Sequence, residues 1–159
     1  MSLLLKFSLI LCLLAGSNFS QMGKKGFYEH FLGSDEKTIN LALDLVNKST
    51  LKERTAYTGA LLMRKAGIVS PLKEKIDLFK EGRKKLEGEI LKEQDNAEYR
   101  FLRLMIQENA PLILGYKQAI KEDKELIISK FHSMDSAVKN SILNYTKTSK
   151  ILIKEDFQN

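Results

Sequence analysis

The sequence predicts an all-α protein: a bundle of antiparallel helical hairpins, about six helices in all, that follows a signal peptide. The 159-residue chain has no tryptophan and only two prolines, and it is rich in Leu, Ile, Lys and Glu, which favours helices over strands. Apolar residues recur at helical spacing over most of the chain. Short stretches rich in capping and helix-breaking residues separate these periodic segments.

Residues 1–20 have the layout of a secretory signal peptide. One positive charge, Lys6, precedes an apolar run, and small and polar residues follow it. Cleavage is expected after Ser17 or Ser20, and an uncleaved anchor is the less favoured alternative, because small residues follow the run directly. Cleavage would remove Cys12, the only cysteine. The mature protein would then have no disulfide and no thiol nucleophile.

The remaining chain divides into three parts. Residues 21–33 hold three glycines and no clean helical period, so they are interpreted as a linker whose aromatic residues can dock on the core. Residues 34–150 are expected to form a single α-helical domain. Residues 151–159 are interpreted as a C-terminal tail with a short apolar turn.

Capping residues set the first helix boundaries inside the domain. Ser34 is expected to cap the first helix. Thr50 and Glu53 have the spacing of a capping box for the second helix, and Gly67 is placed to end it. Pro71 begins the third helix, where its missing N–H has no consequence.

The third helix carries an apolar stripe that predicts a close helix crossing. The stripe runs from Leu72 to Ile90 at helical spacing, and Gly82 lies on it. A glycine is a weak point in an isolated helix, but it also lets another helix approach closely. We therefore expect a second helix to cross at Gly82.

Capping residues and a proline also predict the boundaries of the later helices. Asp95 and Glu98 have capping-box spacing, so Glu98 is interpreted as a helix-end residue rather than a catalytic acid. The fourth helix is expected to end or kink at Pro111. Helix continues over residues 112–131, with an interruption near Gly115 or a new start around residues 122–123, and a last helix begins near Asp135.

Two resemblances accompany this interpretation. The stretch from Thr50 to Asn96 resembles one degenerate tetratricopeptide repeat, with Gly82 and Leu86 at the small-then-bulky spacing of its second helix. The break after that helix has no proline, and no second copy follows at the same period. The signal peptide, the hairpin and the stretch "EYRFLRLMIQENAPLILGY" together resemble small exported helical proteins of Bacteroidota. That resemblance implies export from a bacterium and carries over no catalytic residue.

Charge and motifs exclude several classes of function. The net charge is +6, but acids and bases are interspersed along the chain, and no dense basic block predicts a nucleic-acid partner. The two histidines, His30 and His132, lack partners at metal-ligand spacing. No catalytic motif and no glycine-rich phosphate loop is present, so the sequence predicts no enzyme, no metal and no cofactor.

The fourth helix contains the strongest candidate site. At about 100° per residue, Asn96, Arg100, Arg103 and Gln107 fall on one stripe, and apolar residues cover most of the remaining circumference. The favoured interpretation is a wet face with solvent-exposed arginines. The second is a ligand or partner groove, with Tyr99 and Tyr116 as aromatic walls and Gln107 on the same stripe. The third is a buried structural ion-pair network.

These observations lead to one functional expectation and one alternative. The sequence is that of an exported, non-enzymatic binding or scaffolding module for a protein or peptide, located in the periplasm or at the cell surface of a bacterium. The alternative is an α-helical carrier or sensor of a small anionic or amphiphilic ligand, anchored by Arg100 and Arg103. Neither interpretation predicts a stable membrane span in the mature chain.

Overall fold

The computed structural model describes residues 22–158, and this part of the chain is all-α. The predicted signal peptide lies outside the described residues. The seven α-helices are α1 Lys24–Phe31, α2 Glu36–Lys48, α3 Arg54–Ala66, α4 Leu72–Lys92, α5 Ala97–Asn109, α6 Ile120–Lys130 and α7 Ser136–Tyr145. Three short 3-10 helices are η1 Leu112–Leu114, η2 Phe131–Ser133 and η3 Lys154–Phe157. The predicted fold class is therefore confirmed.

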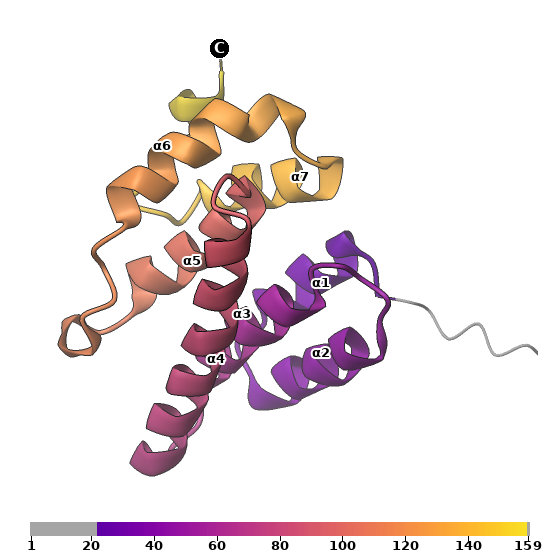
Figure 1. Cartoon of the computed structure of the whole chain (residues 1–159), viewed down its shortest axis with the longest axis vertical. Coiled ribbons are helices and arrows are strands. Elements are labelled where there is room, and N and C mark those ends of the chain that lie inside the picture. Colours follow the sequence, from indigo (N-terminus) through magenta and orange to yellow (C-terminus); the bar gives the residue numbers. More distant parts are fainter. Residues whose placement is uncertain (1–21, 159) are drawn as a thin grey trace, which may run out of the picture.

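The most extensive packing between two helices joins α3 and α4. The long helix α4 runs across the molecule, with α2 on one side and α6 on the other (Figure 1). Gly59 on α3 and Gly82 on α4 meet at the crossing, and a Cβ added to Gly82 would lie 2.5 Å from the carbonyl oxygen of Gly59. The predicted close crossing at Gly82 is confirmed, and its partner is a second glycine. The tetratricopeptide resemblance of this hairpin stays a prediction.

Helix α1 occupies the segment that the sequence pattern assigns to a linker. Phe27, Tyr28 and Phe31 are buried, and the Phe27 ring stacks on the Tyr57 ring at a centroid distance of 3.6 Å. Only three apolar side chains of this short helix face the core, so its apolar pattern is too brief to show a helical period. Packing against α2, α3 and α7, rather than local preference, explains the helix.

Helix α5 lies at the centre of the fold. Phe101, Leu102 and Leu104 are fully buried, and the helix contacts α3, α4 and α6. It ends at Asn109, before Pro111, as expected from the proline. The chain then turns through η1, and Gly115 takes the left-handed conformation with φ of 56°, which glycine adopts without steric cost.

The C-terminal segment packs more closely than a tail would. Leu152 is fully buried, and the Phe157 ring lies 4.6 Å from the Phe131 ring between centroids. Glu108 on α5 fixes the turn before this segment by accepting hydrogen bonds from Tyr145 Oη and Ser149 Oγ, both at 2.7 Å. The apolar turn expected in residues 151–159 is therefore part of the hydrophobic core.

The described helices include none that is both long and apolar enough to cross a membrane. Even α4, with 21 residues, carries charged side chains throughout its length.

Candidate functional site

The N-terminal ends of four helices meet around a surface recess. Lys24 is the first residue of α1, and Glu53, Asn96 and Asp135 are the N-caps of α3, α5 and α7. We call this site the recess, and its lining residues are Lys24, Lys52, Glu53, Asp95, Asn96, Ala97, Glu98, Lys130, Ser133, Met134, Asp135 and Val138. Because helix N-termini carry partial positive charge, this convergence favours the carboxylates gathered there.

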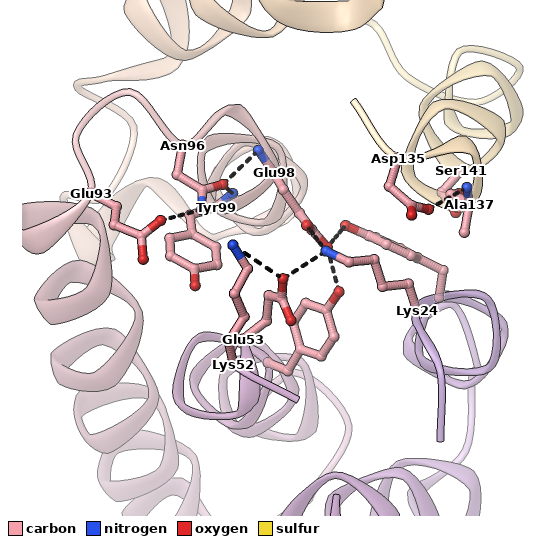
Figure 2. Close-up of polar contacts among 12 residues, drawn as sticks. Lys24, Lys52, Glu53, Glu93, Asn96, Glu98, Tyr99, Asp135, Ala137 and Ser141 are labelled. Carbon is pink, nitrogen blue, oxygen red and sulfur yellow. Dashed lines mark hydrogen bonds and ion pairs between the residues drawn. The ribbon is translucent and has the colours of Figure 1, made fainter. Parts of the chain in front are cut away.

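A buried cluster around Lys24 forms one wall of the recess. Figure 2 shows the Lys24 side chain reaching from α1 to a position between Glu53 and Glu98. Its Nζ donates to Glu53 Oε1 at 2.8 Å and also to Glu98 Oε2. Glu53 and Glu98 are only 3% and 8% exposed, so this ammonium satisfies two carboxylates that are almost removed from water. One cation thus joins the beginnings of α1, α3 and α5.

Two tyrosines complete the Lys24 cluster, which we define as Lys24, Glu53, Glu98, Tyr28 and Tyr57. Both phenol hydroxyls donate to Glu98 Oε1, that of Tyr28 at 3.3 Å. Burial, followed by the charge of Glu98, raises the pKa of both tyrosines above the usual value of 10. Each phenol therefore stays protonated and remains a donor to the carboxylate.

The charge state of Lys24 rules it out as a nucleophile at neutral pH. Burial by itself would lower its pKa, but the hydrogen bonds to Glu53 and Glu98 outweigh burial, and the pKa is raised. A lysine acts as a nucleophile or base only when its pKa is lowered towards neutrality. The Lys24 ammonium therefore serves as a fixed positive charge.

The sequence pattern predicts helix-end roles for Glu53 and Glu98, whereas in the structure both acids belong to the buried Lys24 cluster. The predicted capping box of Thr50 and Glu53 is wrong, because α3 begins at Arg54 and the Glu53 side chain makes no cap bond. The Asn96 side chain, not Asp95, caps α5 by accepting from the backbone N–H groups of residues 98 and 99. Glu98 is therefore free to turn into the core. The only local signal was an acid at the start of each helix, and capping explains that pattern equally well.

The two arginines of α5 form a separate buried ion-pair network. Arg103 makes a two-pronged contact with Asp123 on α6, with Nε to Oδ2 at 2.7 Å and Nη2 to Oδ1 at 2.6 Å. Its Nη1 donates to Glu87 Oε2 on α4 at 2.8 Å. Arg100 Nη1 donates to Asp123 Oδ1 at 3.1 Å. We call these four residues the arginine cluster.

Burial decides between the interpretations of the arginine stripe. Asp123 has no exposed surface and Arg103 is 7% exposed, so the favoured wet-face interpretation is wrong. The third interpretation, a buried ion-pair network, matches the structure. Two guanidinium groups face two carboxylates here. Burial by itself would lower the pKa of Arg103, but the hydrogen bonds and the charge of Asp123 outweigh burial, and the pKa is raised.

The other residues of the predicted groove are buried and do not meet at one place. Tyr116 joins the arginine cluster through a hydrogen bond from its hydroxyl to Glu87. Tyr99 lies instead beside the recess, and the residue is 1% exposed (Figure 2). Gln107 is 2% exposed, and its Oε1 has no hydrogen-bond partner among the described residues. Tyr116 follows α5 and is covered by Phe79 and Arg83 of α4, whereas Tyr99 and Gln107 belong to α5 itself, which packs against α3, α4 and α6.

No group of three His, Cys, Asp or Glu side chains within residues 22–158 is arranged to hold a metal ion. His30 uses its ring nitrogen Nδ1 within α1, 2.7 Å from the Gly26 carbonyl oxygen.

Comparison of the chain with protein-family models, curated proteins and solved structures finds no match. The fold and site define an all-α helical bundle with a mixed-charge recess at the meeting point of four helix N-termini. The resemblance to exported helical proteins of Bacteroidota stays a prediction.

Proposed function

We propose that this protein is an exported, non-enzymatic α-helical binding module that holds a peptide segment of a protein partner in the recess. The supporting observation is the chemistry of the recess lining. Lysines, carboxylates, an amide and a hydroxyl surround apolar side chains in one surface depression. A polypeptide segment presents the same mixture of donors, acceptors and apolar groups, whereas a single small ion presents one sign of charge.

The recess carries exposed charges of both signs, and neither sign dominates. Lys52 and Lys130 are exposed at its edge, together with Asp95 and Asp135. Met134 supplies partly exposed apolar surface beside them, and the buried Val138 belongs to the same lining. Exposed side chains of both signs favour recognition by charge pattern, which contributes to specificity and to the association rate.

The Lys24 cluster gives this recess a rigid wall. Its two carboxylates are bound by an ammonium and two phenols, and each of these groups comes from a helix. Groups held in place before binding lose little conformational entropy when a partner arrives. The proposed binding surface is therefore organised by the fold itself.

The arginine cluster lends no support to the alternative function as a carrier of a small anion. Asp123 and Glu87 already accept hydrogen bonds from the Arg103 guanidinium. A ligand carboxylate or phosphate would have to displace these buried acids, which would leave them uncompensated.

The proposal has two separable parts, and export is tested on its own. The motive is the charged-then-apolar layout of residues 1–20. We expect the protein isolated from its host to begin between Asn18 and Met22, as measured by intact mass and N-terminal sequencing. Recovery of an intact Met1 from the membrane fraction would contradict export with cleavage.

Partner binding is tested by reversing charges at the edge of the recess. Lys130→Glu combined with Asp95→Lys keeps the net charge and alters two exposed side chains, so the fold should be unaffected. Chemical cross-linking in the host, followed by purification and mass spectrometry, should recover a protein partner with the wild type and lose it with this variant.

A matched control places the same reversal away from the recess. Lys37→Glu on α2 with Glu29→Lys on α1 also exchanges one exposed lysine and one exposed acid. This control should retain the partner. Equal recovery from the recess variant and the wild type would refute the assignment of binding to the recess.

A further inference from the structure

The turn between α5 and α6 projects from the molecule (Figure 1), and we call its exposed residues Leu112 and Ile113 the tip. Leu112 and Ile113 are 81% and 93% exposed, although they are adjacent, large and aliphatic. They form η1 between Pro111, which fixes its own φ, and Gly115 in the left-handed conformation. Contiguous exposed apolar surface is often a site of interaction with a protein or a membrane.

The base of the tip is anchored to α4, so the tip keeps its position. The Tyr116 ring packs edge-on against Phe79 at a centroid distance of 5.5 Å. The Arg83 guanidinium carbon lies 4.9 Å from the centroid of the same ring. With the Tyr116 hydroxyl bonded to Glu87, three α4 residues hold the turn. Leu112 and Ile113 therefore stand out from a fixed support.

The α4 surface beside the tip is apolar and basic. At about 100° per residue, Ile76, Lys80 and Arg83 project from the side of α4 on which Tyr116 packs. All three side chains are exposed, and Ile76 extends the apolar surface.

The acids of this part of α4 lie on its other side. Glu74, Asp77 and Glu81 are turned away from the tip at the same helical spacing, and Asp77 is paired with Lys73 at 2.8 Å. Glu87 is the acid on the tip side, and its two oxygens bind Arg103 and Tyr116. The tip side of α4 thus presents the exposed cations Lys80 and Arg83, although the charge of Lys80 also acts on Asp77.

We infer that this surface binds an anionic lipid bilayer, with Leu112 and Ile113 entering the boundary between headgroups and acyl chains and with Lys80 and Arg83 contacting lipid phosphates. Exposed aliphatic groups gain free energy by leaving water, and basic side chains near a surface of negative potential add to the attraction. The net charge of the chain, +6 with Lys6 included, acts in the same direction. This surface is distinct from the recess, so a negative result for lipid binding at the tip would not affect the proposal of peptide binding at the recess.

The absence of tryptophan from the chain permits a site-specific test. Ile113→Trp places a single indole at the tip, and Leu41→Trp places one at an exposed aliphatic position on α2. Both variants are purified from the host in the same processed form, verified by mass. Vesicles of phosphatidylcholine mixed with phosphatidylglycerol should shift the tip indole emission to shorter wavelength and allow quenching by brominated lipids. The α2 indole should show neither change.

The contribution of the basic side chains to vesicle binding is tested with a second pair of variants. In the Ile113→Trp background, Lys80→Gln should weaken vesicle binding about fivefold, the factor for one surface charge. Lys37→Gln on α2 should leave binding unchanged, and added salt should weaken it in both variants. An unshifted tip indole, or equal binding to pure phosphatidylcholine, would overturn the inference. A shift without vesicles that grows with protein concentration would also overturn it, because a second copy of the chain would then cover the tip.

Discussion

Gly59 on α3 and Gly82 on α4 lie against each other where the two helices cross. A Cβ on Gly59 would come within 2.7 Å of the Gly82 carbonyl oxygen and of the Leu86 backbone nitrogen. Both contacts are with backbone, which cannot move aside without shifting a whole helix. The pair of glycines therefore sets the distance between the two most extensively packed helices of the fold.

Substitution of Gly82 should separate these helices. Gly82→Ala should destabilise the protein by roughly 1–3 kcal/mol through overpacking, as measured by urea unfolding. Gly88→Ala is the matched control in the same helix, because a Cβ there meets nothing within 4 Å. The control should stabilise the protein by about 0.5–1 kcal/mol, since alanine is the better helix former. Stabilisation by both substitutions would contradict the close crossing.

Removal of the charge of Asp123 tests the arginine cluster. Asp123→Asn leaves Arg103 with the half-exposed Glu87 as its remaining acid. We expect a loss of about 3–5 kcal/mol in unfolding free energy, as for a buried charge that loses its partner. Glu125→Gln on the exposed surface of α6 should change stability by less than about 0.5 kcal/mol. Similar small losses from both variants would show that the cluster is solvated.

Lys24 and its neighbour Lys25 provide a matched pair within α1. Lys24→Met leaves Glu53 and Glu98 buried without their shared cation, and we expect a loss of about 3 kcal/mol. Lys25 is 84% exposed at its side chain, so Lys25→Met should change stability by less than about 0.5 kcal/mol. The measurement is the midpoint and slope of chemical unfolding. A stability of Lys24→Met equal to that of Lys25→Met would show that the ammonium is not needed at the cluster.

The tyrosines predict a loss of stability at alkaline pH. Burial raises the pKa of all five tyrosines above 10: Tyr28, Tyr57, Tyr99, Tyr116 and Tyr145. Between its unfolded and folded pKa values each group holds its proton only in the folded state, so stability falls as pH rises above about 10. Lys24, whose pKa is also raised, adds to the fall in the alkaline range.

Tyr57→Phe isolates one contribution to this pH dependence. Its baseline stability should be lower, because the hydrogen bond to Glu98 is lost. Above about pH 10, however, its stability should fall less steeply than that of the wild type, by about 1.4 kcal/mol per pH unit. Urea unfolding at a series of alkaline pH values measures both quantities. Parallel curves for the two proteins would contradict a raised pKa at Tyr57.

Local sequence patterns were sufficient for the fold class and for several helix ends. The helical period depends only on apolar residues three and four positions apart in the sequence, so it can be recognised without knowing which helix packs against them. Pro71 precedes α4, Pro111 follows α5 and Asp135 caps α7, as expected from their backbone preferences. Gly82 was also correctly interpreted, because a glycine on an apolar stripe has few other physical explanations.

The roles of the charged residues were decided by tertiary structure alone. Arg103 finds Asp123 20 residues further along the chain, and Lys24 reaches Glu98 across 74 residues. The same local pattern fits an exposed stripe, a helix cap or a buried ion pair, because the energy of a charge depends on its partners and its burial. The packing of α4, α5 and α6 supplies that environment around Arg103, and the packing of α1 supplies it around Glu98. Sequence periodicity thus predicted the helices of residues 34–150 in outline, whereas packing determined that residues 24–31 form α1 and which charges are buried.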